Sequence, residues 1–277
     1  MNNILQRMND TLSGRYAAAE LESVKKALCM EYLGISALSY FTRENLAPDP
    51  ERDKRLDEAL GRLAQGEPLQ YVLGSAPFCG LRFNVDSRVL IPRPETAELV
   101  EWVAQECGTS GSLLDVGTGS GCIAVTLAQK LPCWKVQGWD ISDGALEVAR
   151  ENSRLNGTDV KFRKVDILNA GEPDCRFDVI VSNPPYVLER EKDQMEDTVL
   201  LHEPHTALFV PDNDALLFYR AIVEFGKKSL VPGGALYFEI NPLEAEPLRL
   251  MLSEVGFHNL ELRKDIFGKQ RMIKAIL

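Results

Sequence analysis

The 277-residue sequence lacks the features of a membrane or disulfide-bonded protein. No apolar stretch approaches the roughly 20 residues that cross a bilayer, and the N-terminus has acidic and polar residues where a signal peptide has its apolar core. The six cysteines are scattered without a C-x-x-C pair, which argues against a disulfide framework or a zinc knuckle. We therefore expect a cytoplasmic protein with reduced thiols that binds neither a membrane nor a metal ion.

The sequence also has fewer basic than acidic residues. The 31 Lys and Arg residues face 41 Asp and Glu residues, so the net charge is −10 and the isoelectric point is about 5.0. Proteins that hold nucleic acid by its phosphates usually have a basic face. We therefore expect no stable nucleic-acid binding.

The first part of the chain shows helical spacing. Apolar residues recur every three to four positions in two stretches (Leu21, Val24, Leu28, Tyr32 and Leu33; then Leu56, Leu60 and Leu63). This spacing predicts a helical domain over residues 1–70. Leu69–Gly74 and Leu81–Val85 then alternate with period two, which predicts a linking β-hairpin over residues 71–92.

From Ser112 onward, apolar runs alternate with helical stretches. The predicted strands are 113–116, 134–139, 160–165, 179–181 and 235–240, with 256–262 and 272–277 as a closing pair, and the clearest helices are 123–130 and 145–156. This alternation predicts an α/β domain over residues 93–277, with a Rossmann-like, mostly parallel sheet, an antiparallel closing strand and helices on both faces.

A glycine-rich turn follows the first strand of this domain. It reads Asp115-Val116-Gly117-Thr118-Gly119-Ser120-Gly121. The dinucleotide fingerprint would require Gly or Ala where Cys122 stands, and no Gly-Lys-Ser/Thr follows as in a phosphate loop. The turn therefore suits a nucleoside that carries a charged amino-acid tail and no phosphate.

Acidic residues follow the next two predicted strands. Asp140 is placed to accept hydrogen bonds from both hydroxyls of a ribose, and Asp166 and Ile167 are placed to meet the edge and face of an adenine. Taken singly, Asp140 could be a helix N-cap, a role for which Ser142 is as good a candidate, and Asp166 could simply end a strand. Taken in order at three strand ends, these residues predict an S-adenosylmethionine site.

The loop Asn183-Pro184-Pro185-Tyr186 follows the apolar run 177–182 directly. Its two prolines fix the backbone and remove two N–H donors, which leaves carbonyl oxygens and the Asn183 amide beside an aromatic ring. Such a loop suits a planar group that carries an –NH2. Asn-Pro alone marks an ordinary turn, but after the fourth strand of a nucleoside-binding sheet it predicts an acceptor site.

These residues resemble a known family. The turn 115–121, Asp140 and the loop 183–186 resemble class I S-adenosylmethionine methyltransferases that act on planar nitrogen, and more narrowly the PrmC/HemK family. Four further stretches carry the resemblance: Gly66–Tyr71, Leu90–Thr96, Glu203-Pro204 with Ala207-Leu208, and Asp265–Arg271. It implies an enzyme that uses S-adenosyl-L-methionine to methylate N(5) of the glutamine in the Gly-Gly-Gln motif of class I peptide-chain release factors, which supports translation termination.

The resemblance also implies roles for individual residues. Asn183, Pro184 and Tyr186 would be catalytic, and Pro185 and Arg93 would join them in binding the substrate, although an Arg93 paired with an acid in a structural role is an open alternative. The cofactor residues would be Asp115, Gly117, Thr118, Gly119, Ser120, Gly121, Asp140, Asp166, Ile167 and Asn183. By family analogy, the helical domain would dock the release factor.

The chain departs from the family pattern at two positions. The family places a glutamate directly after the equivalent of Thr96, whereas here Ala97 intervenes and the acid is Glu98, so no role is assigned to it. His202 stands where the family commonly has an aromatic residue. His202 and His205 have no third ligand nearby in the sequence, which favours structural roles over metal binding.

Two alternatives remain open at this stage. An adenine-amine DNA or RNA methyltransferase uses the same kind of loop on a flipped base, but it would require a basic groove or a target-recognition domain. A non-catalytic regulator that binds the cofactor is the second alternative, and the presence of both the glycine turn and the acceptor loop argues against it.

Overall fold

The computed structural model describes residues 1–43, 47 and 49–277. The chain divides into two compact units, Met1–Ser75 with Glu196–His202, and Ala76–Met195 with Glu203–Leu277. The helical domain predicted over residues 1–70 includes residues 44–46 and 48, which lie outside the described part. Within the described ranges, no helix is long and apolar enough to cross a membrane.

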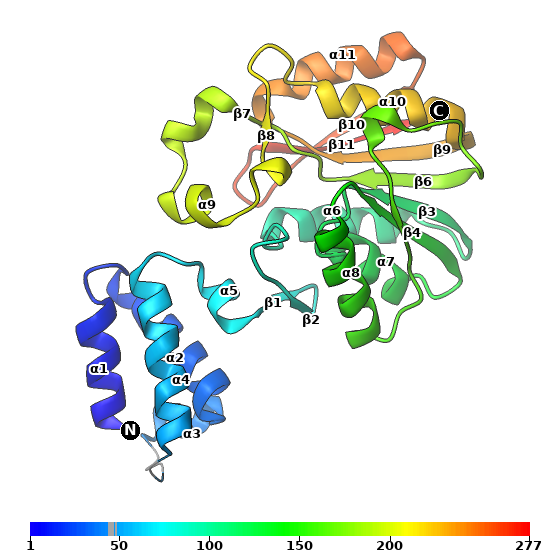
Figure 1. Cartoon of the computed structure of the whole chain (residues 1–277). Helices are drawn as coiled ribbons and strands as arrows, with labels where there is room; N and C mark the ends of the chain where they lie inside the picture. Colours follow the sequence, from blue (N-terminus) through cyan, green and yellow to red (C-terminus); the bar gives the residue numbers. More distant parts are fainter. Residues whose placement is uncertain (44–46, 48) are drawn as a thin grey trace. The chain divides into compact units, whose positions relative to one another are not determined.

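The first unit is built from helices packed around one apolar core (Figure 1). These helices are α1 (Asn2–Leu12), α2 (Ala18–Leu33), α3 (Ala37–Phe41), α4 (Pro50–Ala64) and α5 (Leu69–Leu73). Helix α9 (Asp197–His202) belongs to the same unit but contributes no residue to this core. The predicted helical spacing in α2 and α4 is confirmed, because Leu28, Leu56 and Leu63 are fully buried. Helix α4 begins where Asp49 accepts a hydrogen bond from the Arg52 N–H at 3.1 Å, with Pro50 in the first helical position.

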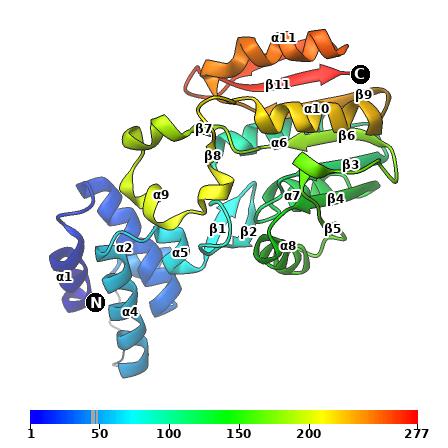
Figure 2. The ribbon, with the colours of Figure 1, turned by 45° about the horizontal axis from the view of Figure 1, so that its top comes forward.

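The strand predicted over Leu69–Gly74 is wrong. This segment forms helix α5, whose Val72 N–H donates to the Pro68 carbonyl at 3.0 Å. The adjacent residues Tyr71 and Val72 are both buried, whereas a strand with one buried face buries every second residue. A stretch of six residues is too short for its apolar spacing to distinguish a strand from one helical turn. The hairpin is formed instead by β1 (Ser75–Phe78) and β2 (Leu81–Asn84), side by side in Figure 2.

The second unit contains a seven-stranded sheet with the strand order β10-β11-β9-β6-β3-β4-β5. The strands are β3 (Gly111–Val116), β4 (Trp134–Asp140), β5 (Lys161–Lys164), β6 (Phe177–Ser182), β9 (Leu230–Glu239), β10 (His258–Lys264) and β11 (Gln270–Ile276). Strands β3, β4, β5, β6 and β9 pair in parallel, whereas β11 runs antiparallel to both β9 and β10. The predicted Rossmann-like sheet with an antiparallel closing strand is therefore confirmed.

Successive residues of each strand face opposite sides of the sheet, so each face has its own core. Leu113 and Val179 pack with α6 (Pro94–Glu106) and α7 (Cys122–Lys130), while Leu114 and Ile180 pack with α10 (Leu217–Ser229) and α11 (Ala245–Val255). Helix α8 (Asp143–Leu155) packs beside α7 against β4 and β5. Figure 1 shows these two helical layers on either side of the sheet.

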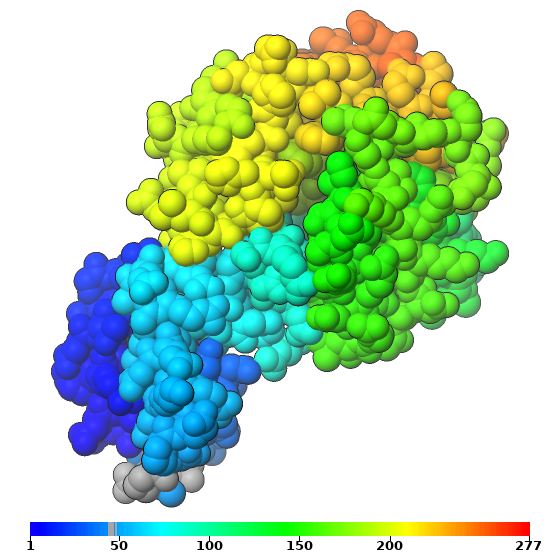
Figure 3. All heavy atoms as spheres, in the orientation of Figure 1, coloured from blue at the N-terminus to red at the C-terminus, as the bar shows by residue number. Residues whose placement is uncertain are grey.

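Short elements connect the layers. They are η1 (Ile167–Asn169), β7 (Val187–Leu188), η2 (Glu189–Gln194), η3 (His205–Ala207), β8 (Phe209–Val210) and η4 (Pro242–Glu244). Residues 203–216 and α10 form the yellow part of this unit's surface in Figure 3. Because β3 lies between β4 and β6 and all three are parallel, the segments that follow them emerge at one edge of the sheet.

Candidate functional site

The turn after β3 presents backbone to this edge. Gly117, Gly119 and Gly121 have φ angles of 73°, 54° and 79°, a region that residues with a side chain disfavour. No described atom lies within 4 Å of a Cβ built on Gly117 or Gly119, whereas a Cβ on Gly121 would lie 3.2 Å from that of Ala149. The first two glycines therefore border open space, and the third allows α7 to pack closely against α8.

Asp115 lies beneath this turn and is fully buried. Its Oδ2 accepts hydrogen bonds from Thr118 Oγ1 at 2.6 Å and from the Ala124 N–H at 3.2 Å. Burial raises the pKa of Asp115 to about 7, although these two hydrogen bonds act in the opposite direction. Its Oδ1 has no hydrogen-bond partner among the described residues. Asp115 thus holds the turn in shape and keeps one free acceptor.

Asp140 connects the end of β4 to the same turn. Its Oδ2 accepts a hydrogen bond from the Gly119 N–H and its Oδ1 accepts one from the Ser142 N–H, both at 2.9 Å. Burial raises the pKa of Asp140, and these hydrogen bonds oppose the shift. The N-cap of α8 is Ser142, whose hydroxyl accepts from the Ala145 N–H at 3.2 Å. Asp140 is therefore not the N-cap.

Asp166 and Ile167 follow β5 and are half-buried. The Asp166 carboxylate accepts hydrogen bonds from the Leu168 N–H at 3.0 Å and from Asn169 Nδ2 at 2.7 Å, and it thereby caps η1. Ile167 packs against the core on the α10 side of the sheet. Both residues thus lie at the strand end where an adenine was predicted, and Asp166 also shapes the short helix that follows.

The loop Asn183–Tyr186 follows β6, and its polar groups have partners in distant segments. Asn183 Nδ2 donates to Thr96 Oγ1 at 3.2 Å, and the Tyr186 hydroxyl donates to Glu239 Oε1 at 3.1 Å. Thr96 Oγ1 in turn donates to Glu239 Oε2 at 2.6 Å. Burial is the main factor that raises the pKa of Tyr186, so its phenol stays protonated. The loop therefore rests on a buried carboxylate.

Sequence reasoning missed Thr96 and Glu239 as site residues. Both are buried, with exposed fractions of 2% and 1%. The available signal was an acidic residue inside the apolar run predicted as strand 235–240. Sequence reasoning also missed Asn152. Its buried Nδ2 donates to the Ser120 carbonyl at 2.9 Å, which connects helix α8 to the glycine turn. No motif marks Asn152, because it lies mid-helix among ordinary polar residues.

Arg93 is paired with a buried acid. Its Nη2 lies 2.5 Å from Oε1 of Glu203, whose Oε2 accepts the Ile91 N–H at 3.2 Å. The guanidinium side chain is 33% exposed and that of Glu203 is 1% exposed. The structural alternative for Arg93 thus has direct support, and its exposed part leaves room for a substrate contact.

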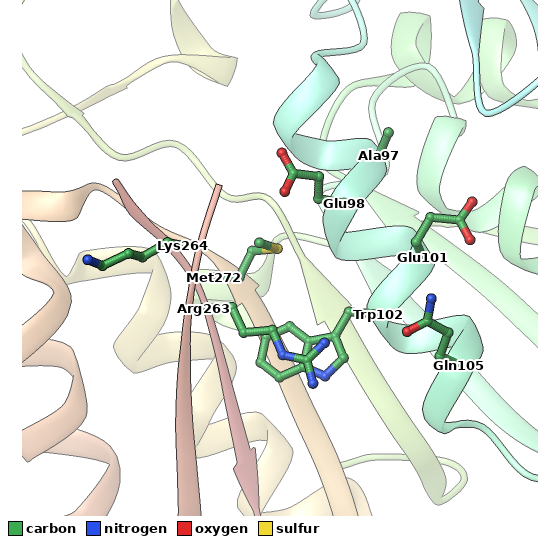
Figure 4. Close-up of a pocket in the computed structure, with 8 residues that line it drawn as sticks. All are labelled: Ala97, Glu98, Glu101, Trp102, Gln105, Arg263, Lys264 and Met272. Carbon is green, nitrogen blue, oxygen red and sulfur yellow. The ribbon is translucent and has the colours of Figure 1, made fainter. Parts of the chain in front are cut away.

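Glu98 lies away from this network, on the outer face of α6. Its Oε1 accepts the Ile266 N–H at 3.2 Å. It also lines a surface cavity of about 340 Å³ between α6 and the β10–β11 pair, where the Arg263 guanidinium stacks over the Trp102 ring at 4.0 Å (Figure 4). None of the predicted site residues lines this cavity. Glu98 therefore has a structural hydrogen bond and no place in the predicted site.

His202 and His205 lie in different surroundings. Nε2 of His202 is buried and has no hydrogen-bond partner in the described part of the chain. The His205 ring packs edge-on against Phe209, with ring centroids 5.3 Å apart. Across the described residues, no group of three or more His, Cys, Asp or Glu side chains is arranged to hold a metal ion.

Known proteins share this architecture. Residues 94–209 match the family described as "Methyltransferase small domain" and residues 3–74 match "PrmC N-terminal domain". A human methyltransferase 10 domain containing protein is similar in fold, with a TM-score of 0.51 at 19% identity over 71% of this chain and 89% of that one. A 16S rRNA methyltransferase from T. thermophilus, solved with AdoMet and guanosine, has a TM-score of 0.52 at 21% identity over 73% and 49% of the two chains.

The fold is that of a class I S-adenosylmethionine-dependent methyltransferase. A release factor glutamine methyltransferase from Bacteroides thetaiotaomicron is 44% identical over 276 residues, which cover 99% of each chain. One from Flavobacterium psychrophilum is 43% identical and covers 94% of this chain and 95% of that one. The chain belongs to the family of release factor glutamine methyltransferases.

Proposed function

We propose that this protein transfers the methyl group of S-adenosyl-L-methionine to the side-chain amide nitrogen of the Gly-Gly-Gln glutamine in class I release factors. The observation that carries the proposal is the strand order, which places β3 between β4 and β6. The glycine turn, Asp140 and the Asn183–Tyr186 loop therefore emerge at neighbouring strand ends. This arrangement supports a nucleoside site next to a site for a planar –NH2 group, as transfer between them would require.

The residues at this edge fit the cofactor. The open space beside Gly117 and Gly119 would admit the amino-acid tail, and the free Oδ1 of Asp115 offers an acceptor beneath it. Asp140, Asp166 and Ile167 would receive the ribose and the adenine at the next two strand ends. When bound there, S-adenosylmethionine supplies an electrophilic methyl group on a sulfonium.

The Asn183–Tyr186 loop would bind the acceptor. An amide nitrogen is a weak nucleophile because its lone pair is delocalised into the carbonyl. Asn183 Oδ1 and the Pro184 carbonyl would accept the two amide hydrogens, which raises the electron density on nitrogen and holds it in line with the methyl group. Such positioning supplies roughly 7–11 kcal/mol in well-oriented systems. Pro185 stiffens the loop, and the amide loses one hydrogen as a proton to water after transfer.

Tyr186 would support this loop and does not act as a base. Its phenol donates a hydrogen bond to Glu239, and its backbone carbonyl accepts one from Asn241 Nδ2 at 3.3 Å. Since burial raises its pKa, the phenolate is not available near neutral pH. The ring can therefore present a fixed aromatic surface to the planar amide of the substrate.

The helical first unit would supply contacts that select the partner, because a site for one amide cannot choose among all glutamines. Unlike the second unit, this unit contains none of the cofactor or acceptor residues proposed above. Translation termination takes place in the cytoplasm, which is where we expect the protein to act.

Incubation with methyl-labelled cofactor tests this function directly. We expect label on an intact class I release factor, none on its Gly-Gly-Gln Gln→Ala variant, and none on DNA or RNA. Label on nucleic acid alone would instead support an adenine-amine methyltransferase. Cofactor binding in calorimetry without transfer to any substrate would support a non-catalytic regulator.

A further inference from the structure

The hydrogen bonds beneath the acceptor loop form a chain that ends at one carboxylate. Asn183 Nδ2 donates to Thr96 Oγ1 at 3.2 Å, and Thr96 Oγ1 donates to Glu239 Oε2 at 2.6 Å. Thr96 lies in the first turn of α6, and Glu239 is the last residue of β9. Both side chains are almost fully buried, so water does not compete for these hydrogen bonds.

The Glu239 carboxylate fixes which atoms donate and which accept along this series of hydrogen bonds. An ionised carboxylate can only accept hydrogen bonds, and a threonine hydroxyl has a single hydrogen to give. Thr96 gives that hydrogen to Glu239, so its oxygen is an acceptor toward Asn183. The amide of Asn183 must then turn its nitrogen to Thr96, which leaves Oδ1 for a ligand.

Three groups favour the ionised form of Glu239. The Thr96 and Tyr186 hydroxyls donate to its two different oxygens. The guanidinium of Arg271, whose Nη1 donates to the Ile240 carbonyl at 3.4 Å, adds a nearby positive charge. Burial, together with the nearby Glu95, raises the pKa of Glu239, these three groups lower it, and the net shift is upward.

We propose that Thr96 and Glu239 are positioning residues that turn the oxygen of Asn183 toward the substrate and thereby select glutamine over glutamate. This inference rests on the proposed function and deepens it. A glutamine amide brings two N–H donors to Asn183 Oδ1 and the Pro184 carbonyl, whereas a glutamate brings an oxygen that both acceptors repel. Sites built for a hydrogen-bonding group discriminate strongly against analogues that lack it.

Binding of two release factors to the full chain tests the inference. One has Gly-Gly-Gln and the other Gly-Gly-Glu, and each Kd is measured with S-adenosylhomocysteine present so that no transfer occurs. We expect Thr96→Val, which keeps the shape and removes the hydroxyl, to reduce the preference for glutamine by about tenfold. Thr96→Ser keeps the hydroxyl and should restore the preference. Loss of packing alone would weaken both complexes equally and leave their ratio unchanged.

Glu239→Gln provides a second variant. A neutral amide at this position can donate a hydrogen bond to Thr96, so the hydrogen bonds from Asn183 through Thr96 would no longer have one fixed direction. We expect it to reduce the same preference while S-adenosylhomocysteine binds as tightly as before. An unchanged preference in both variants would overturn the inference. If the unaltered protein neither bound nor methylated the release factor, the proposed function itself would be wrong.

Discussion

The glycine turn after β3 and the Asn183–Tyr186 loop after β6 each rest on a buried acid, but the two acids make different kinds of hydrogen bond. Asp115 accepts from Thr118 and Ala124, which are 3 and 9 residues away in the chain. Glu239 accepts from Tyr186 and Thr96, which are 53 and 143 residues away. The first acid shapes its own turn, whereas the second joins a strand, a helix and a loop.

This difference suggests a division of labour. The turn acts through backbone shape, since two of its glycines border open space. The loop acts through the direction of its hydrogen bonds, since Asn183 donates to the side chain of Thr96 in helix α6. Substitutions in the turn should therefore affect cofactor binding, and substitutions in the loop should affect transfer.

Asn183→Ala should have the largest effect. It removes the acceptor proposed for one amide hydrogen. We expect kcat to fall by about 10²–10³-fold, which is the cost of removing one oxyanion-hole donor in other enzymes. The affinity for cofactor, measured by calorimetry, should fall far less than kcat, because Asn183 is one of ten residues predicted to contact the cofactor. An unchanged kcat would show that the loop does not hold the acceptor amide.

Gly119→Ala should have an intermediate effect and act on the cofactor. The new methyl group would meet no described protein atom, so it would intrude only on a ligand in the open space. We expect the Kd for S-adenosylmethionine to rise about tenfold or more, equivalent to about 1.4 kcal/mol. Gly157→Ala is the matched control, because Gly157 is exposed and has a similar φ of 64° with equally open surroundings. Equal Kd values for the two variants would exclude a ligand at Gly119.

Asp115→Asn should act on stability and its pH dependence. The pKa of Asp115 is raised to about 7 in the folded protein from an ordinary 3.8, so the folded state keeps a proton that the unfolded chain loses. The contribution of Asp115 to the free energy of unfolding is therefore fully present below about pH 4 and is lost as the pH rises through about 7. Asparagine keeps the acceptor for Thr118 and Ala124 and removes this loss.

Urea unfolding at pH 5 and pH 8 measures this difference. The folded-state pKa of about 7 lies about two units above pH 5, and one unit corresponds to about 1.4 kcal/mol. We therefore expect the parent to lose about 2–3 kcal/mol of unfolding free energy between pH 5 and pH 8, and the asparagine variant to lose none of it. Asp115→Leu lacks the acceptor and should be less stable at both pH values. If the unfolding free energy of the parent did not fall between pH 5 and pH 8, the pKa of Asp115 would not be raised as described.

The sequence predicted the elements and residues whose signals are local. The alternation of apolar runs indicated the strands of the sheet, and the spacing of Leu56, Leu60 and Leu63 indicated helix α4. The one wrong element, Leu69–Gly74, is too short for its period to separate a strand from one helical turn. Asp115 and Asn183 stand out because they belong to continuous motifs.

Thr96 and Glu239 could not be connected from the sequence. They lie 143 positions apart, and only the packing of α6 against the sheet brings them together. Asn152 was missed for the same reason, because its partners Asn84 and Ser120 are 68 and 32 residues away. Local patterns indicate which loops carry chemistry, but not which buried side chains orient them.

Glu203 accepts hydrogen bonds from both Ile91 and Arg93 and so holds the loop before α6, and one of these hydrogens can be used to measure the motion of that loop. Pro92 and Pro94 have no amide hydrogen, so the only such hydrogens between residues 91 and 94 are those of Ile91 and Arg93. The Ile91 amide is buried and donates to Glu203, more than one hundred residues further along the chain. The exchange rate of that single hydrogen with solvent therefore records how often this segment detaches.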